Sequence, residues 1–202
     1  MVNAPESQQL TPNLCLWQVF DPAVKTDLFS TAALSGGTLF LIDPIRLAQA
    51  PLEKLLAGRQ AAGILVSNAN HVRGSAELAR ACKVPIYCAP ETVGEFEDVE
   101  VVRLNAGMKI VPGVTAIAIE GAALGEFAFH FGDDGGTMVM GDALIRLDPY
   151  GFSLLPAKYC QNQKELRRSL RQLLDWSFER LLFAHGAPLL TRPHERLETL
   201  LR

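Results

Sequence analysis

The sequence lacks most of the features that assign a protein to a compartment or to a polymer partner. None of its segments offers about 18 consecutive apolar residues, so we expect no transmembrane helix. The N-terminal stretch MVNAPESQQLTPNL has neither the basic start nor the apolar run of a signal peptide. A net charge of −3, from 19 basic and 22 acidic side chains, gives no sign of a basic surface for nucleic acid. We therefore expect a cytoplasmic protein that binds neither membranes nor nucleic acid.

Cysteine is also scarce, with single residues at positions 15, 82, 88 and 160. None of them pair at CxxC spacing, which argues against a zinc knuckle or a thioredoxin-type motif. In a chain without an export signal, reduced thiols in the core are the expected state. A cysteine nucleophile would need a neighbouring base, and the sequence gives no sign that any of the four lies near His185.

What is present is an ordinary globular composition, with 49% apolar and 20% charged residues. We find no linker, no low-complexity tract and no defensible repeat. A chain of 202 residues is long enough for one large domain, so we expect a single domain over residues 1–202.

Residues 1–100 combine a strand-rich start with alternating strands and helices. Strands are predicted at residues 14–20, 28–35 and 37–44 (GTLFLIDP), with Gly36-Gly37 as a hairpin turn between the last two. A helix follows at 52–62, then a fully apolar strand at 63–66 that is typical of a strand buried on both faces. A second helix is predicted at 74–82, with Ser75 as its cap, before the strand VPIYCAP.

The rest of the chain repeats this plan. VEVVRL, KIVPGVTAIAI, EFAFHFG and TMVMGD are predicted strands separated by glycine-rich turns. A helix is predicted at 162–174, then the strand RLLFAHG and a last helix at 193–201. Two such halves predict two sheets packed face to face with helices on the outside.

Five segments, taken in order, carry a resemblance to a known family. They are LIDP, the strand–loop–helix ILVSNANHVRGS, the turn and strand GAALGEFAFHFG, then MVMGDAL and LLFAHGAP. Across almost the whole chain this order resembles the metallo-β-lactamase superfamily, whose members carry THxHxDHxxG, a GHTPG-like turn, a GD pair and a final GHG-like segment. The resemblance implies an α/β fold, a four-layer αββα sandwich, and mostly hydrolases with one or two metals at the sheet edge.

The metal ligands of that family are mostly replaced in this chain. Its first two histidines fall on Asn68 and Asn70, its aspartate on Val72 and its third histidine on Arg73. The histidine of the GHTPG-like turn falls on Ala122.

Two expected ligand positions keep a residue of the family type. The bridging aspartate of the GD pair is Asp142, and the last histidine is His185. These two residues are the candidate catalytic residues.

The replacements weaken the case for a metal centre. Amide oxygens of Asn68 and Asn70 are weak ligands for zinc, iron or manganese, and the Arg73 guanidinium has no lone pair to offer. A positive charge about 4 Å from a divalent ion costs on the order of 8 kcal/mol at an effective dielectric of about 20. A complete structural zinc site binds with roughly 10–16 kcal/mol, so little affinity would remain. We expect no metal, with a single zinc, iron or manganese ion on Asp142, His185 and His71 as the alternative.

A salt bridge between Arg73 and Asp142 is predicted where the metal would be, with His185 and the two asparagines completing the network. His71 lies one step away from the family's ligand positions, so its direction is open. Asp43, at the end of LIDP, is expected to support the loop by hydrogen bonds to backbone.

Other residues are assigned more simply. His130 alternates with apolar neighbours and is expected to hydrogen-bond within its sheet. Tyr159 is a candidate for the cleft wall, together with Asp43, Asn68, Asn70, His71, Arg73 and Ala122.

Three functions are compatible with these residues. The preferred one is a pseudoenzyme that uses the scaffold to bind a small molecule or a protein, in a monomer or a homo-oligomer. The second is a hydrolase of an ester, thioester or phosphodiester that uses one atypical metal. The third is a metal-free hydrolase in which Asp142 orients His185 as general base, although the sequence supplies no nucleophile for it.

Overall fold

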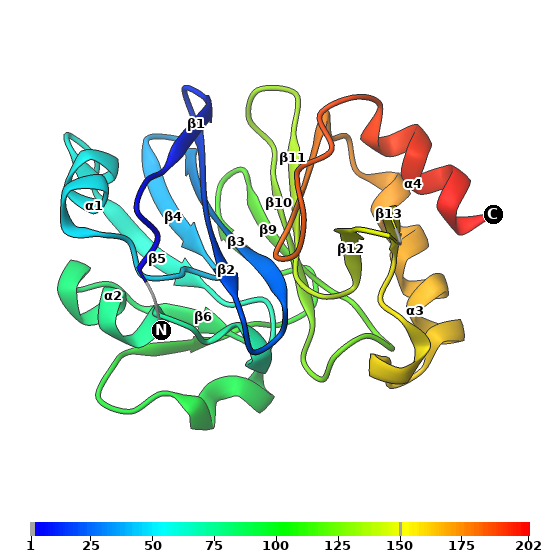
Figure 1. Cartoon of the computed structure of the whole chain (residues 1–202). Helices are drawn as coiled ribbons and strands as arrows, with labels where there is room; N and C mark the ends of the chain where they lie inside the picture. Colours follow the sequence, from blue (N-terminus) through cyan, green and yellow to red (C-terminus); the bar gives the residue numbers. More distant parts are fainter. Residues whose placement is uncertain (1–2, 150) are drawn as a thin grey trace.

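The computed structural model describes residues 3–149 and 151–202. Two β-sheets pack face to face in the middle of the molecule, and helices cover the outer face of each (Figure 1). The four-layer αββα sandwich predicted from the sequence is therefore confirmed. In the described ranges, no helix is long and apolar enough to cross a membrane.

The first sheet has seven strands in sequential order. They are β1 (Gln8–Thr11), β2 (Leu14–Asp21), β3 (Thr26–Ser35), β4 (Thr38–Ile42), β5 (Ala61–Leu65), β6 (Ile86–Cys88) and β7 (Val101–Arg103). Pairing is antiparallel from β1 to β4 and parallel from β4 to β7. Gly36 and Gly37 form the predicted two-residue hairpin turn, and both have the positive φ that such a turn requires.

The second sheet has five strands in the order β14-β11-β10-β9-β8. Their bounds are β8 (Lys109–Val111), β9 (Val114–Ala118), β10 (Phe127–Phe131), β11 (Thr137–Met140) and β14 (Arg180–Phe183). Only β14 runs parallel to its neighbour, β11, among these strands. A separate hairpin of β12 (Leu144–Leu147) and β13 (Gly151–Leu154) follows β11. Neither this hairpin nor β1 was predicted.

The outer layers consist of short helices. On the first sheet lie α1 (Gln49–Leu56) and α2 (Ser75–Cys82), and on the second lie α3 (Gln163–Leu170), the 3-10 turn η4 (Arg171–Asp175) and α4 (Pro193–Leu201). The predicted helix at 52–62 is wrong in its second half, because residues 61 and 62 already belong to β5. The predicted Ser75 cap is also wrong: the cap residue is Gly74, and the Ser75 hydroxyl is buried without a hydrogen-bond partner in the described chain.

Three apolar cores hold the four layers together. The core between the sheets includes Phe40, Leu65, Phe129 and Leu182. Each of the other two cores joins one sheet to its helices. Because both faces of the central strands are buried, polar side chains at the strand ends are held on rigid supports.

Candidate metal centre at the ends of four strands

Four strands end at the same place and carry the polar residues of the site. Asp43 directly follows β4, and residues 67–71 follow the parallel strand β5. In the second sheet, Met140 of β11 pairs with Phe183 of β14, and Asp142 and His185 each lie two residues further on. Carboxyl ends of parallel strands are a common place for a ligand site, and here two sheets contribute to one cluster.

The loop after β5 explains why His71 faces the site. Asn68 caps the 3-10 turn η1 (Ala69–His71), because its Oδ1 accepts a hydrogen bond from the Asn70 backbone N–H at 2.8 Å. The turn directs the His71 side chain inward, where it is 2% exposed, and leaves Asn70 exposed. The histidine whose direction the sequence left open is thus oriented by the asparagine three residues before it.

Hydrogen bonds fix the orientation of the His71 ring. The Ser67 hydroxyl donates to Asp43 Oδ2 at 2.7 Å, and the Ser67 backbone N–H donates to Asp43 Oδ1 at 2.8 Å. His71 Nδ1 lies 2.8 Å from Ser67 Oγ and 3.1 Å from Asp43 Oδ2, and both of these atoms are available only as acceptors. His71 therefore carries a proton on Nδ1, and its Nε2 faces the cluster. Asp43 supports the loop through backbone, as expected.

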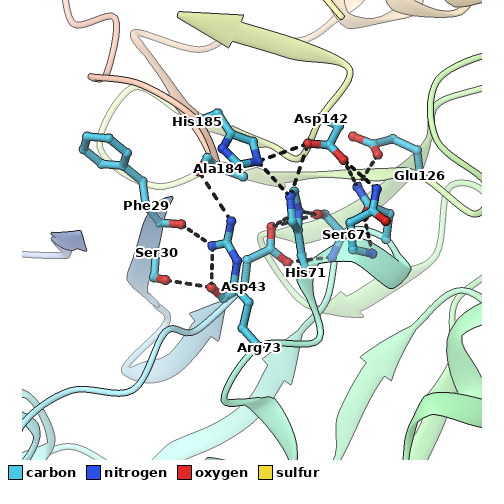
Figure 2. A network of polar contacts seen from close by, with 12 residues as sticks. Phe29, Ser30, Asp43, Ser67, His71, Arg73, Glu126, Asp142, Ala184 and His185 are labelled. Carbon is cyan, nitrogen blue, oxygen red and sulfur yellow. Dashed lines mark hydrogen bonds and ion pairs between the residues drawn. The ribbon is translucent and has the colours of Figure 1, made fainter. Parts of the chain in front are cut away.

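Three donor atoms meet at the centre of the site (Figure 2). His71 Nε2 lies 3.3 Å from His185 Nε2 and 3.3 Å from Asp142 Oδ1, and His185 Nε2 lies 3.2 Å from the same Asp142 oxygen. The three atoms form a nearly equilateral triangle. The His185 side chain is 15% exposed, against 2% for His71, so the His185 side of the triangle is the less buried one.

The second oxygen of Asp142 faces amides instead. Asn70 Nδ2 donates to Asp142 Oδ2 at 3.1 Å, and Asn68 Nδ2 donates to it at 3.3 Å. Asn68 Nδ2 also donates to Glu126 Oε2, and the Ala143 backbone N–H donates to Glu126 Oε1 at 3.0 Å. One carboxylate thus has histidines on one oxygen and amides on the other.

Glu126 was not predicted as a site residue. It comes directly before β10, is 2% exposed, and lies on the opposite flank of His71 from Arg73 (Figure 2). The available signal was an acidic residue at the start of the otherwise apolar strand EFAFHFG. Gly141 of the GD pair makes room for it, because a Cβ there would lie 2.6 Å from Glu126 Oε1 and 2.5 Å from Ser67 Oγ.

The predicted salt bridge between Arg73 and Asp142 is wrong. Both residues are described, and no ion pair joins them; Asp142 pairs with His71 and His185. The Arg73 guanidinium instead donates to three backbone carbonyls, those of Phe29 at 2.6 Å, Asp43 at 3.0 Å and Ala184 at 3.5 Å (Figure 2). Its positive φ of 41° turns the side chain toward the junction where the Phe29 N–H bonds to the Ala184 carbonyl. Arg73 therefore ties the two sheets together.

The charges of the cluster shift the pKa of each member. Burial alone would lower the pKa of His71, but Asp142 and Asp43 raise it to about 9. Burial, reinforced by the charge of Asp142, raises the pKa of Glu126 to about 8. Burial would also raise the pKa of Asp142, yet the two histidines hold it well below its usual range. Burial lowers the pKa of His185, against the attraction of Asp142. Without a metal, the preferred protons are on His71 and Glu126.

The remaining predicted residues lie away from this contact network. Ala122 is fully buried in the core under α3, and Tyr159 is 61% exposed on the 3-10 turn η3 (Ala157–Tyr159). His130 hydrogen-bonds the Ser177 carbonyl, which belongs to a loop and not to the sheet.

Comparison with known proteins agrees with this architecture. A family model described as "Metallo-beta-lactamase superfamily" matches residues 7–202. A solved structure of TMB-1 is similar with a TM-score of 0.75 at 11% identity, covering 99% of this chain and 98% of that one. A crystal structure of the DIM-1 metallo-beta-lactamase gives 0.76 at 12% identity with 98% of both chains covered. A metallo-beta-lactamase from Pontibacter korlensis gives 0.73 at 12% identity, with 97% and 98% covered. At these identities the solved structures establish the fold alone. A search of curated protein sequences finds no match.

Proposed function

Because the chain belongs to the metallo-β-lactamase superfamily, we propose that it is a hydrolase whose centre takes a single divalent metal ion on His71, Asp142 and His185. The observation that carries this proposal is the triangle of donor atoms, with edges of 3.2 to 3.3 Å. It favours the single-metal alternative over the metal-free interpretation preferred from the sequence.

The donor set fits zinc or a similar ion. Tetrahedral bonds of about 2.0–2.1 Å put neighbouring ligand atoms about 3.3–3.4 Å apart, close to the edges of the triangle. His71 presents Nε2 with its Nδ1 hydrogen bonded toward Asp43 and Ser67, which is the arrangement that commonly orients a metal-binding histidine. Arg73 does not oppose binding by direct contact, because its guanidinium is directed to carbonyl groups.

The reaction class that fits is hydrolysis of an ester, thioester or phosphodiester. When bound, such an ion supplies an activated water and polarises the bond to be cleaved. The chain itself orients the donors: Asp43 and Ser67 hold His71, and the amides hold Asp142. Asn70 is exposed beside Asp142 and has a free amide oxygen in the described contacts, so it is placed to orient a substrate.

We propose one metal and not two. Asp142 Oδ2, the oxygen on the far side from the histidines, is occupied by the N–H groups of Asn68 and Asn70. An N–H donor cannot share that oxygen with a cation at the same position. Val72 and Ala122, at two further ligand positions of the family, have no donor atom in their side chains.

A second candidate is binding of a small molecule or a protein without catalysis. The observation that favours it is that the cluster closes without any ion: a protonated His71 bridges Asp43 at 3.1 Å and Asp142 at 3.3 Å, and so occupies the position between two carboxylates. The pKa of about 9 for His71 agrees with this form at neutral pH.

Metal content separates the two candidates. Untagged protein, grown with added zinc, iron and manganese and then dialysed, is expected to hold about one equivalent and to lose thermal stability with chelator. His185→Ala removes a donor atom and is expected to retain clearly less of the ion after dialysis. His130→Gln changes a buried histidine outside the cluster and is expected to keep it. Less than roughly a tenth of an equivalent in the wild type would overturn the hydrolase proposal in favour of the second candidate.

A further inference from the structure

Glu126 is a buried carboxyl group that the proposed chemistry does not use. Both of its oxygens accept hydrogen bonds, one from the Asn68 amide and one from the Ala143 backbone N–H. These two donors lie on either side of Asp142: Ala143 is its neighbour in sequence, and Asn68 also donates to its Oδ2. One carboxyl group thus holds both the loop that carries Asp142 and the amide that faces it.

We propose that Glu126 is a positioning residue for the metal centre, acting through Asn68 to keep Asp142 Oδ1 turned toward the histidines. This inference rests on the proposed function, because it assigns a role within the same site. It needs no contact between Glu126 and the ion or substrate.

The hydrogen-bond directions require a carboxyl group at this position. Asn68 Oδ1 is already engaged by the Asn70 backbone N–H, so Nδ2 is the group that must face Glu126 and Asp142. The Ala143 group is an N–H and can only donate. Both oxygens of residue 126 must therefore accept a hydrogen bond, which a carboxyl group can do whether or not it carries a proton.

Glutamine has nearly the same shape, but its amide nitrogen cannot accept a hydrogen bond, whereas the hydroxyl oxygen of a protonated carboxyl group still can. In Glu126→Gln, an NH2 group must face either Asn68 Nδ2 or the Ala143 N–H. If Asn68 rotated to relieve the clash, its oxygen would meet Asp142 Oδ2 and the cap on η1 would be lost. Either change loosens Asp142 without removing a metal donor.

The expected effect is a weaker metal site. Changing a residue that orients a metal ligand typically costs about 10- to 100-fold in metal affinity, and we expect Glu126→Gln to fall in this range. Glu120→Gln is the matched control, since Glu120 is exposed six residues earlier and its side chain holds no part of the site. Its affinity should equal that of the wild type.

The test measures metal affinity by competition with a chelator for the wild type, Glu126→Gln, Glu120→Gln, Asn68→Ala and the Glu126→Gln/Asn68→Ala double variant. If Glu126 acts through Asn68, the Glu126→Gln substitution must weaken metal binding by a clearly smaller factor in the Asn68→Ala background than in the wild type. A second readout needs no metal: the side-chain NH2 protons of Asn68, followed by NMR in metal-free protein, should be protected from exchange in the wild type and lose protection in Glu126→Gln.

The outcomes separate the two proposals. A loss of about tenfold or more in Glu126→Gln, with the reduced effect in the double variant, supports the inference. A wild type that binds one ion together with an unchanged Glu126→Gln affinity overturns it and leaves the hydrolase proposal intact, even if the variant melts earlier. A wild type that binds no ion overturns both, because no metal centre remains to be positioned.

Discussion

The two oxygens of Asp142 differ in what surrounds them, and the difference separates two regions of the site. On the histidine side, Oδ1 meets His71 and His185, both of which can give a lone pair to a cation. On the amide side, Oδ2 accepts hydrogen bonds from the Nδ2 groups of Asn68 and Asn70, which have no lone pair to give a cation. A single carboxylate can therefore present a metal ligand in one direction and a closed hydrogen-bond network in the other.

Replacing the shared residue should have the largest effect. Asp142→Asn removes the negative charge and one of three metal donors, so we expect metal affinity to fall on the order of 1,000-fold. Competition titration measures it, with Asp98→Asn as control because Asp98 is exposed and its positive φ suits asparagine. Tight binding in Asp142→Asn would mean that the ion is held elsewhere.

The pH dependence of the unfolding free energy of the metal-free protein tests whether His71 and Glu126 carry protons. The raised pKa of His71, about 9, stabilises the fold below pH 6.5, and this contribution is lost as pH rises toward 9. The raised pKa of Glu126, about 8, likewise makes the fold less stable as pH rises from 4.5 to 8. Since each unit of pKa shift corresponds to about 1.4 kcal/mol, chelated protein should thus lose several kcal/mol of unfolding free energy between about pH 5 and 9.

Denaturant titrations across this range provide the measurement. The Asp43 and Asp142 carboxylates, whose pKa values are lowered, add stability that is lost below pH 4, so the maximum should lie near pH 5. In Glu126→Gln only the His71 contribution remains, and the curve should be flatter between pH 5 and 6.5. Stability that rises from pH 6.5 to 9 in chelated protein would contradict the assignment.

A substitution outside both regions should affect the fold more than the site. Arg73→Lys keeps the charge but a lysine ammonium cannot span three carbonyl groups, so we expect a loss of about 1–3 kcal/mol of stability. Chemical denaturation measures the loss, with the exposed Arg168→Lys as control. We expect metal stoichiometry to remain one, and a loss of the ion at unchanged stability would count against the role of Arg73 as a tie between sheets.

The smallest effect is expected on the amide side at the surface. Asn70→Ala removes one hydrogen bond to Asp142 from an exposed position, which should weaken metal binding by only about 3- to 5-fold. His185→Ala, on the histidine side, should cost about 100-fold because it removes a donor atom. If the two substitutions weakened metal binding equally in the same titration, the histidine side and the amide side would not differ in function as proposed.

Much of the fold could be predicted because its signals are local. Gly36-Gly37 specifies its turn, and the apolar run before Ser67 specifies a strand buried on both faces. The errors occurred where tertiary contacts decide the local structure. Ala61 continues a helical pattern in the sequence but pairs with Leu39 of β4. Ser75 resembles a helix cap, but its side chain is buried. The order of segments predicted the sandwich because that order is a property of the whole chain.

The site was less predictable, because its geometry depends on side-chain direction. Matching positions to the family drew attention to Asn68 and Arg73, but not to the 3-10 turn that brings His71 inward. Arg73 was expected to seek the nearest carboxylate, whereas its positive φ directs it to backbone carbonyls. Glu126 was missed because its partners are 58 and 17 residues away in sequence.

The three donor groups of the triangle belong to different sheets. His71 follows a strand of the first sheet, and Asp142 and His185 follow strands of the second. An ion held by all three adds its binding free energy to the docking of one sheet on the other, as any ligand specific for the native state does. A refolding chain with only one sheet formed can present at most two donors. The spectrum of a coloured ion such as Co2+ would then record, during refolding, the moment at which the two halves of the sandwich meet.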